Sequence, residues 1–439
     1  MKTTQKIPKS KLSRASKLVA TGAKVGVNYI KYYGNKTLMD EDKARAILDE
    51  NNADDIYDTL KELKGSALKV AQMLSMDKNL LPTAYTDKFS LSQFSVPPLS
   101  PALVLRTLKQ YLNQSPDNLF DKFDYQSINA ASIGQVHKAE KDSKLLAVKI
   151  QYPGIADSIT SDLNLVKPIA ARMFNFKSGE IDKYFNEVRN KLLEETDYEL
   201  EIAQSIELSE ACKNLKNLKF PKYYKELSSQ KVLTMDFMEG IQISEFIKQE
   251  PNKKTINTIA QALWDFYMYQ IHVLRKVNAD PHPGNFKVDK NHKNLIALDF
   301  GCIKNIPNDF YVPYFELADP EKLNNEAIFE AKLFELEILR EEDTPKEVKF
   351  IKGIFYELLS LFTQPLQQEF FDFSKSDFID AITELTKKYS KDMELKKQNG
   401  NRGSKHFIYI NRTFFGLYNL MFDLKATNVK TNNFTSISN

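Results

Sequence analysis

The sequence contains little cysteine, and its two cysteines lie far apart. Cys212 and Cys302 are the only thiols among 439 residues, and neither belongs to a Cys-x-x-Cys or Cys/His spacing. Isolated cysteines of this kind exclude a disulfide framework and a structural zinc site. We therefore expect both thiols to be reduced and buried.

Long apolar runs and a strong excess of one charge are also missing. No stretch of 18 uncharged apolar residues occurs, and the best candidate, residues 407–422, is interrupted by Asn411, Arg412 and Asn419. A membrane-spanning helix is therefore not expected. The formal net charge is only +3, which argues against a protein that works by neutralising a nucleic-acid backbone. We expect no nucleic-acid partner.

What is present is an ordinary globular composition. Hydrophobic residues make up 42% of the chain and charged residues 27%, with 29 Phe and 20 Tyr, so a sizeable core is expected. A chain of this length has room for two or three units of roughly 100 to 200 residues. Breaks in the helical and strand patterns favour five segments: residues 1–39, 40–120, 121–240, 241–425 and 426–439. The last segment is rich in Asn, Thr and Ser and is expected to be disordered.

The first 39 residues are locally basic, with nine lysine or arginine side chains and no acid. Apolar residues such as Leu18, Val25 and Ile30 lie among these charges at helical intervals, which is typical of a basic helix on an anionic membrane surface. A solvated tail is the alternative, and a mitochondrial transit peptide is disfavoured because Arg14 is the only arginine of this segment. We expect a cytoplasmic protein, with peripheral contact to the inner membrane face left open and a mitochondrial location less favoured.

The clearest chemical pattern consists of Asp280, Asn285 five residues later, and Asp299 in an Asp-Phe-Gly sequence. In kinase-like enzymes such an Asp and Asn flank the transferred phosphoryl group, and the second Asp holds magnesium. We assign Asn285 and Asp299 as Mg²⁺ ligands because hard oxygen atoms suit this cation, and a short hairpin between them must bring them together. Asp280 is assigned to orient or accept the proton of an attacking hydroxyl or water. His282 is interpreted as a structural loop residue.

Upstream, a hairpin is expected from residues 127–139 and 145–151, and its second strand carries Lys149 among apolar neighbours. A buried lysine needs an anion, because an unpaired buried charge is costly. ATP phosphates and a helix glutamate are the usual partners in kinases. The loop at 129–137 stands where a kinase has its phosphate flap, but Gly134 is its only glycine, so it should be tighter than a GxGxxG loop.

Several of these motifs together resemble the UbiB family of atypical kinase-like ATPases, in particular the branch that supports coenzyme Q biosynthesis. The resemblance is carried by residues 64–75, 130–137, 147–154 and 195–201 and by the Asp280 and Asp299 motifs. It extends over about residues 7–425. It implies an α+β, protein-kinase-like two-lobed fold with a helical N-terminal extension packed over the active site.

The resemblance also implies a regulatory motif. The family's Lys-x-Gly-Gln sequence looks like Lys69 to Gln72, with Ala71 in place of the glycine. The family's Glu-x-Asp sequence looks like Glu195 and Asp197, which are the expected partners of Lys69.

Further roles follow for the catalytic and nucleotide-binding residues. Asp280, Lys149 and Glu201 are the expected catalytic residues, and Glu201 resembles the helix glutamate that pairs with Lys149. Which glutamate takes which lysine stays open at this point. The residues expected to contact the nucleotide are Ala130, Ala131, Ser132, Ile133, Gly134, Val136, Lys149 and Met235.

The favoured function is an ATPase or lipid-coupled kinase-like enzyme that binds Mg²⁺ with ATP or ADP and supports isoprenoid quinone biosynthesis. One alternative is a small-molecule phosphotransferase of the aminoglycoside-kinase type, which also uses an Asp-x-x-x-x-Asn loop. Another is a nucleotide-gated scaffold without turnover. Expected partners are nucleotide, an anionic membrane surface, and isoprenoid lipids or quinone-biosynthesis proteins, while the choice between monomer and homodimer stays open.

Overall fold

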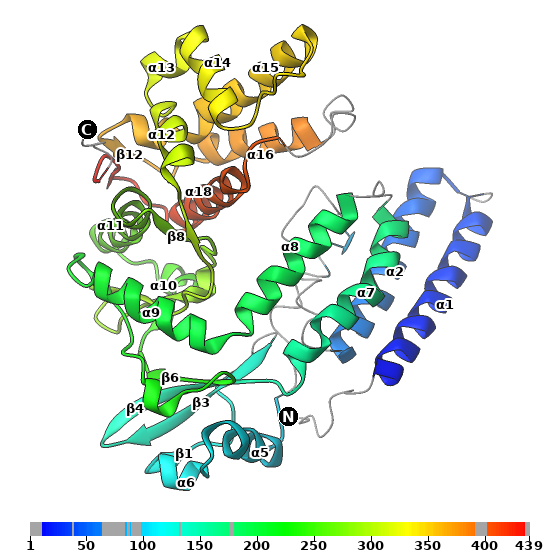
Figure 1. Cartoon of the computed structure of the whole chain (residues 1–439), viewed down its shortest axis with the longest axis vertical. Coiled ribbons are helices and arrows are strands. Elements are labelled where there is room, and N and C mark those ends of the chain that lie inside the picture. Colours follow the sequence, from blue (N-terminus) through cyan, green and yellow to red (C-terminus); the bar gives the residue numbers. More distant parts are fainter. Residues whose placement is uncertain are drawn as a thin grey trace. The chain divides into compact units, whose positions relative to one another are not determined.

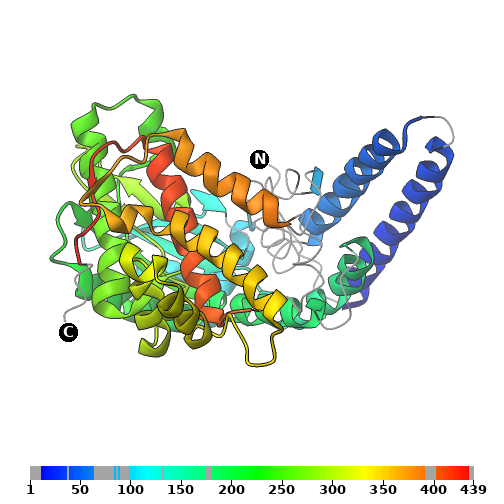
Figure 2. The ribbon, with the colours of Figure 1, turned by 90° about the horizontal axis from the view of Figure 1, so that it is seen from above.

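The computed structural model describes residues 11–36, 39–63, 84–85, 88, 98–130, 133–174, 180–390 and 402–434. They fall into two units, one drawn from Met1–Ala203 and Lys222–Phe237, the other from Gln204–Pro221 and Met238–Asn439. The division lies within helix α9 (Tyr198–Cys212), and Figures 1 and 2 trace each unit by its sequence colours. Both units combine helices with small sheets, so the predicted α+β class is confirmed.

An antiparallel sheet forms the centre of the first unit. Its strands run in the order β1 (Lys122–Phe123), β3 (Gly134–Lys141), β4 (Lys144–Gln151) and β6 (Val232–Asp236), and β2 (Asn129–Ala130) pairs with β3. Strands β3 and β4 form the predicted hairpin, whose turn residues Asp142 and Ser143 have φ angles of 49° and 62°. Side chains alternate between the two faces of a strand, so Leu146, Val148 and Ile150 of β4 all enter the hydrophobic core.

Helices supply much of the rest of that core. The helices described in this unit are α1 (Lys11–Asn35), α2 (Glu41–Leu63), α5 (Pro101–Leu112), α6 (Pro116–Leu119), α7 (Ile155–Phe174), α8 (Glu180–Glu195), the first six residues of α9 and the short η2 (Lys225–Leu227). Ile56 and Leu60 of α2 lie in the same buried cluster as Val104 of α5, Ile159 of α7 and Leu192 of α8. The N-terminal extension is therefore part of the core of the first unit.

Helices α1 and α2 pair along their length, so the solvated-tail alternative is wrong for residues 11–35. Asn28 donates through Nδ2 to Asn52 Oδ1 at 3.1 Å and to Asp55 Oδ2 at 2.9 Å. One turn further, Tyr32 is buried against Ala44 and Leu48. The paired face of α1 is thus partly polar, and Figure 1 shows the two helices side by side.

The second unit is mostly helical. Its strands form three small sheets: β5 (Leu218–Lys219), β10 (Leu295–Ala297), β9 (Phe286–Val288) and β7 (Ile241–Gln242) in that order; β11 (Ile303–Asn305) with β8 (Lys276–Asn278); and β12 (Phe370–Phe371) with β13 (Val429–Lys430). Its helices are α10 (Ile243–Lys248), α11 (Lys253–Tyr269), η3 (Gln270–Leu274), η4 (Pro283–Asn285), α12 (Asn308–Glu316), α13 (Pro320–Asn324), α14 (Glu326–Glu335), α15 (Pro345–Phe362), η5 (Gln364–Gln367), α16 (Ser376–Ser390) and α18 (Lys405–Asp423).

Helix α11 is the central element of the second unit. Its N-cap residue Asn252 accepts a hydrogen bond from Thr255 N at 3.0 Å, and Leu263, Trp264 and Tyr267 are completely buried. The predicted burial of both thiols is confirmed, since Cys212 and Cys302 are free and buried. In the part of the chain that the structure describes, no helix is both long and apolar enough to cross a membrane.

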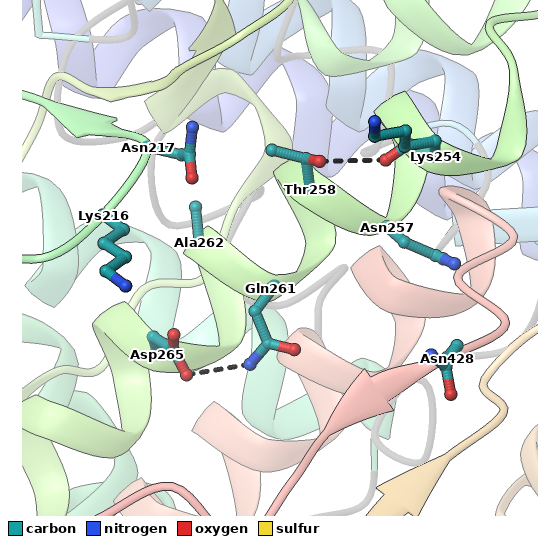
Figure 3. Close-up of a pocket in the computed structure, with 9 residues that line it drawn as sticks. All are labelled: Lys216, Asn217, Lys254, Asn257, Thr258, Gln261, Ala262, Asp265 and Asn428. Carbon is teal, nitrogen blue, oxygen red and sulfur yellow. Dashed lines mark hydrogen bonds between the residues drawn. The ribbon is translucent and has the colours of Figure 1, made fainter.

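The structure corrects two predicted boundaries. Residues 204–221, placed with the first lobe from the sequence, belong to the second unit, where Leu218 and Lys219 pair in parallel with β10. The C-terminal segment is not disordered over residues 426–434, because Val429 is fully buried and Thr431 O accepts a hydrogen bond from Trp264 Nε1 at 3.3 Å. The prediction of disorder rested on the Asn- and Thr-rich composition of this segment. The segment is ordered because its backbone groups form hydrogen bonds with side chains of α11. Figure 3 shows these side chains, Asn257 and Gln261, together with Asn428 of the segment.

Candidate nucleotide site

Lys149 lies on the face of the β-sheet that points away from the hydrophobic core of the first unit. Its neighbours Val148 and Ile150 are fully buried in that core, and the two-residue period of a strand turns Lys149 to the opposite face. The register sets Val136 of β3 and Leu233 of β6 directly across from it. The lysine is therefore held at the middle of the sheet by a strand on each side.

The ammonium group of Lys149 is paired within this unit. Its Nζ lies 2.7 Å from Glu201 Oε1, and the two side chains are only 16% and 7% exposed. The same Nζ lies 4.9 Å from the ring centroid of Tyr198, which is completely buried. Burial of either charge alone would be costly, so the pair explains how a lysine is tolerated here. The expected contact between Lys149 and Glu201 is thus present.

The residues predicted to contact the nucleotide from this sheet divide into two groups. Val136 and Met235 lie opposite Lys149 and Ala147 in the strand register, so they share the face of the lysine. Ile133 does not, because its side chain belongs to the core cluster and its carbonyl accepts a hydrogen bond from Tyr152 N at 2.9 Å. The side chain of Ile133 therefore lies in the core, and the expected nucleotide contact of this residue stays a prediction. Ala130 ends β2, and Ala131 and Ser132 lie outside the described residues.

Gly134 is required for space and not for loop flexibility. A Cβ atom at this position would lie 2.7 Å from the carbonyl oxygen of Ile150 and 2.9 Å from the hydroxyl of Tyr198. The single glycine of this loop therefore allows β3 to approach β4 closely beside the buried tyrosine.

The predicted regulatory motif is only partly described. Lys69 and Gln72 lie outside the described residues, so their pairing with Glu195 and Asp197 stays a prediction. Asp197 has a local role as the residue before α9, since its Oδ1 accepts a hydrogen bond from Leu200 N at 3.1 Å.

Lys231 lies near Asp197 and was not predicted from the sequence to belong to the site. Its Nζ donates to Thr196 O at 3.2 Å. Burial lowers the pKa of Lys231, and the charges of Asp157 and Asp197 oppose that shift. The only signal for it in the sequence is its place at the start of a strand.

The loop of Asp280 in the second unit is held by its own polar groups. Asn285 Nδ2 donates to Asp280 O at 3.0 Å, and Asp280 O also accepts from His282 N at 2.8 Å. His282 Nδ1 accepts from Gly284 N at 3.0 Å, in agreement with its structural interpretation. Asp280, Asn285 and Asp299 are all half-buried.

The predicted hairpin brings Asn285 and Asp299 together. Phe286 of β9 pairs with Ala297 of β10, and Leu298 N donates to Asn285 O at 2.9 Å. Immediately after this bridge, Gly301 N donates to Asp299 Oδ1 at 2.9 Å, which turns the chain at the Asp-Phe-Gly sequence. The two expected metal ligands therefore lie on facing ends of one short hairpin.

Asn278 links Asp280 to Asp299 by hydrogen bonds, and this role was not predicted from the sequence. Its Nδ2 donates to Asp299 O at 3.0 Å, and its Oδ1 accepts from Asp280 N at 3.3 Å. Asn278 is 1% exposed, and its own N–H donates to Gln270 Oε1 at 2.9 Å from the π-helical turn η3. Its position two residues before Asp280 is a signal that could have found it.

Two further residues, Gly416 and Tyr267, lie near the loop. Gly416 of α18 lies so close to Pro281 that a Cβ atom on it would collide with the proline ring. Tyr267 of α11 is fully buried, and burial raises the pKa of its hydroxyl well above the usual range, with the charges of Asp280 and Cys302 adding to the shift. A neutral tyrosine of α11 and a glycine of α18 thus lie near the loop of Asp280.

The oxygen donors suit a hard cation that also has other ligands. Asn285 uses its Nδ2 on Asp280 O, and no described residue donates to its Oδ1. Within the described residues, no group of three or more His, Cys, Asp or Glu side chains gathers as a complete metal site. One amide oxygen and one carboxylate fit Mg²⁺ that takes its remaining ligands from phosphate and water.

The chain is similar to known proteins over much of its length. Residues 92–320 match the ABC1 atypical kinase-like domain. The chain is 29% identical over 335 residues to the probable serine/threonine-protein kinase abkA of Dictyostelium discoideum, covering 71% of this chain and 59% of that protein. It is 30% identical over 321 residues to the atypical kinase COQ8, mitochondrial, of Saccharomyces cerevisiae, covering 71% and 63%.

A plant relative and a solved structure extend the comparison. The chain is 32% identical over 283 residues to the chloroplastic Protein ACTIVITY OF BC1 COMPLEX KINASE 8 of Arabidopsis thaliana, covering 61% of this chain and 37% of that protein. It thus spans less than two thirds of the length of each of these three relatives. The structure of the Rv3197–erythromycin complex from Mycobacterium tuberculosis matches with a TM-score of 0.59, 22% identity and coverage of 90% and 98%, which supports the fold. Because the domain match covers more than half of the sequence, this chain belongs to the ABC1 atypical kinase-like family, to which the UbiB proteins also belong.

Proposed function

We propose that this chain binds Mg-ATP or Mg-ADP and hydrolyses ATP as an atypical kinase-like enzyme. The observation that carries the proposal is the hydrogen-bonded loop that holds Asp280, Asn285 and Asp299 together in the second unit. The buried ion pair of Lys149 with Glu201 in the first unit supports it, since such a lysine is the usual phosphate partner in kinases.

The proposed roles follow from the position of each group. Lys149 would bind the α- and β-phosphates, and Asn285 Oδ1 and Asp299 would hold the cation, which when bound neutralises phosphate charge. Asp280 would accept a proton from water while the water oxygen bonds to the γ-phosphorus and the bond to the bridging oxygen of ADP breaks. The products are ADP and inorganic phosphate.

The direct test measures phosphate release by the purified chain with Mg²⁺ and ATP, with and without anionic lipid vesicles. We expect turnover that Asp299→Asn abolishes. Tight ATP binding with background hydrolysis in both proteins would favour the nucleotide-gated scaffold instead. Phosphoryl transfer to an alcohol in a metabolite screen would favour the small-molecule phosphotransferase.

We further propose that the enzyme supports isoprenoid quinone or related lipid biosynthesis. The motifs shared with the coenzyme Q branch of the UbiB proteins and the similarity to relatives named atypical kinase COQ8 support this assignment. Quinone and precursor levels in cells that lack the gene test it, and unchanged levels of both would contradict it.

An anionic membrane surface is the proposed partner of α1. One face of this helix leaves Val19, Ile30 and Tyr33 exposed at 73%, 73% and 67%, and the helix carries lysines such as Lys24 and Lys31 but no acid. Apolar side chains beside lysines suit the boundary between lipid headgroups and acyl chains. We propose peripheral attachment, and the names of relatives include both mitochondrial and chloroplastic proteins.

Vesicle co-sedimentation tests this attachment. We expect Ile30→Ser to weaken binding to phosphatidylglycerol vesicles, because it removes apolar area from the exposed face of α1. Ile47→Ser on α2 is the matched control, since Ile47 is exposed at 40% on the neighbouring helix. Equal loss in both variants, or no binding by the wild type, would contradict the proposal.

A further inference from the structure

A joint of two residues, Thr196 and Asp197, connects α8 to α9 in the first unit. Asp197 N donates to Glu194 O at 3.0 Å, which closes the end of α8. Glu201 N donates to Asp197 O at 3.0 Å, which begins α9. The position of this joint therefore sets where the first turn of α9, with Glu201, lies.

Two side chains of the sheet region hold the carbonyl oxygen of Thr196. Gln151 Nε2 donates to it at 3.0 Å from β4, and Lys231 Nζ donates to it at 3.2 Å from the turn before β6. The two donors are joined to each other, since Gln151 N donates to Lys231 O at 3.0 Å. Gln151 and Thr196 are both buried, so water competes little for these bonds. The joint is thus fastened to β4 and to the turn that leads into β6.

The same face of β4 carries this fastening and the buried ion pair. Gln151 follows Lys149 by two positions, so both side chains leave the strand on the face opposite to Ile150, which lies in the core. Lys149 contacts Glu201, and Gln151 contacts Thr196 five positions earlier in the chain. These two contacts leave the strand about 7 Å apart, and two separated contacts fix both the place and the direction of the first turn of α9.

Carboxylates near Lys231 hold its ammonium group at the joint. Burial lowers the pKa of Lys231, and the charges of Asp157 and Asp197 act in the opposite direction. Asp157 lies in the first turn of α7, and Asp197 directly precedes α9. The ammonium group therefore interacts with the starts of two helices as well as with the carbonyl oxygen of Thr196.

We propose that Gln151 and Lys231 are positioning residues, which fasten the start of α9 to the sheet and so hold Glu201 on Lys149. The inference rests on the proposed role of Lys149 in nucleotide binding. In kinases the pair of this lysine with a helix glutamate must be formed for activity, and the position of that helix controls the pair. Gln151 and Lys231 act through Glu201, and loss of either donor lets the carboxylate of Glu201 move away from Lys149.

Calorimetric titration of the full chain with Mg-ATP tests the proposal through Gln151→Met. Methionine keeps the volume of glutamine and removes the donor to Thr196 O, and the Oε1 atom that it also removes has no hydrogen-bond partner among the described residues. The dissociation constant of Mg-ATP should rise about fivefold, which is the effect of one hydrogen bond. In the Glu201→Gln background the same substitution should change it less than about twofold, because the contact that Gln151 positions is already lost.

Lys231→Met provides a second variant from the other donor. It should weaken Mg-ATP binding as Gln151→Met does, and its effect should also disappear in the Glu201→Gln background. Lys225→Met is the matched control, because Lys225 is an exposed lysine of η2 in the same unit, and it should leave the dissociation constant unchanged. If Gln151→Met raised the dissociation constant by the same factor in both backgrounds, or in neither, the proposal would be overturned.

Urea unfolding supplies a readout that needs no nucleotide. Gln151→Met and Glu201→Gln should be coupled, so that the double variant raises the unfolding equilibrium constant by at least about twofold less than the product of the two single effects. Independent effects of the two substitutions would overturn the proposal even in a chain that binds Mg-ATP. Failure of the wild type to bind Mg-ATP would instead contradict the proposed nucleotide function, and the unfolding measurements would then decide this inference alone.

Discussion

In the first unit, Lys149 and Glu201 lie 52 positions apart and meet as one buried ion pair. In the second unit, Asp280, Asn285 and Asp299 fall within 20 consecutive positions and are joined by hydrogen bonds through Asn278 and a two-strand hairpin. The first arrangement depends on a sheet and a helix that pack against one another. The second depends on a short loop whose backbone groups are satisfied locally. We expect the first to control nucleotide binding and the second to control turnover.

The largest expected effect is that of Asp280→Asn on turnover. Loss of the proton acceptor should lower the rate constant of ATP hydrolysis by roughly 10³-fold, within the range for a general base. The dissociation constant of Mg-ATP should stay within about twofold, because Asp280 carries no role in phosphate binding. Steady-state phosphate release and a thermal-shift titration measure the two quantities. If Asp280→Asn lost Mg-ATP affinity as severely as turnover, the proposed division of nucleotide binding and turnover between the two units would be contradicted.

The next largest effect is expected at the ion pair. Lys149→Met removes the phosphate partner and breaks the buried ion pair with Glu201, so nucleotide affinity should fall and the free energy of unfolding should drop by about 3 kcal/mol. Urea unfolding measures the stability. The double variant Lys149→Met/Glu201→Gln is the control, since it should recover much of the stability but none of the affinity. Normal Mg-ATP binding by Lys149→Met would show that the assignment of this lysine is wrong.

A smaller effect is expected at Asn278. Asn278→Ala breaks two hydrogen bonds of a buried side chain, which should cost about 2 kcal/mol of stability and lower turnover by at least tenfold. Asn278→Asp is the informative companion, because it retains an acceptor for Asp280 N but removes the donor to Asp299 O. We expect Asn278→Asp to require more Mg²⁺ for half-maximal activity. Unchanged Mg²⁺ dependence in both variants would mean that Asn278 does not position the metal ligands.

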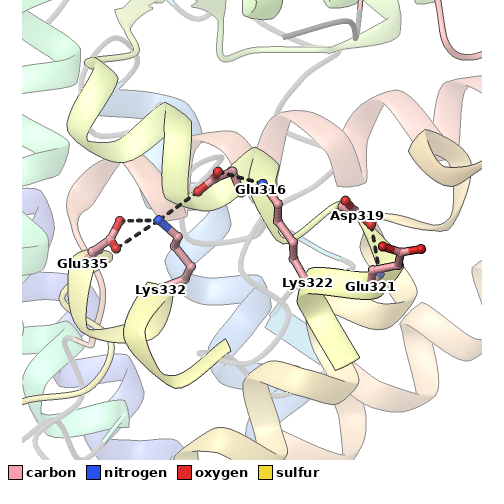
Figure 4. A network of polar contacts seen from close by, with 6 residues as sticks. All are labelled: Glu316, Asp319, Glu321, Lys322, Lys332 and Glu335. Atoms are coloured by element: carbon pink, nitrogen blue, oxygen red, sulfur yellow. Dashed lines mark hydrogen bonds and ion pairs between the residues drawn. The ribbon is translucent and has the colours of Figure 1, made fainter. Parts of the chain in front are cut away.

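The smallest effect concerns an ion-pair network in the second unit that belongs to neither of these two arrangements. Figure 4 shows Glu316 between Lys322 and Lys332, at 2.8 Å from each ammonium. The hydrogen bonds from Lys322 and Lys332 lower the pKa of Glu316. A lowered carboxyl pKa stabilises the fold above the unfolded value of about 4.3 and loses that contribution as pH falls through the folded pKa.

Glu316→Gln should therefore destabilise the protein by about 1 kcal/mol at pH 7 and by less in acid. Melting temperatures measured between pH 7 and about 3.5 would follow the difference between variant and wild type. Glu321→Gln is the matched control, because Glu321 lies on α13 in the same region but forms no ion pair among the described residues. A difference that grows as pH falls would contradict the direction of the pKa shift.

The sequence was most informative where the chemistry is local. The spacing of Asp280, Asn285 and Asp299 predicted a hairpin that joins them, and the hairpin is present. The prediction for the hairpin that carries Lys149 was also confirmed. Both succeeded because turn residues and strand alternation act over only a few positions.

Predictions failed where distant residues decide the outcome. Residues 204–221 were placed with the first lobe, but Leu218 and Lys219 pair with β10 in the second unit. Residues 426–434 were expected to be disordered, but amide side chains of α11 bind their backbone. Composition reports neither of these contacts, because the partner groups lie far away in the chain.

By itself, the sequence determined the residue types and the short-range spacing that an ABC1 kinase-like loop needs. Only the tertiary structure decided that Glu201 is the described glutamate that pairs with Lys149, that Asn278 joins Asp280 to Asp299, and that Gly134 serves close packing. The physical reason is that a buried charge or amide pairs with whichever partner the packing of sheet and helix places within hydrogen-bond distance. The spacing of residues along the sequence constrains that distance only within a turn or hairpin.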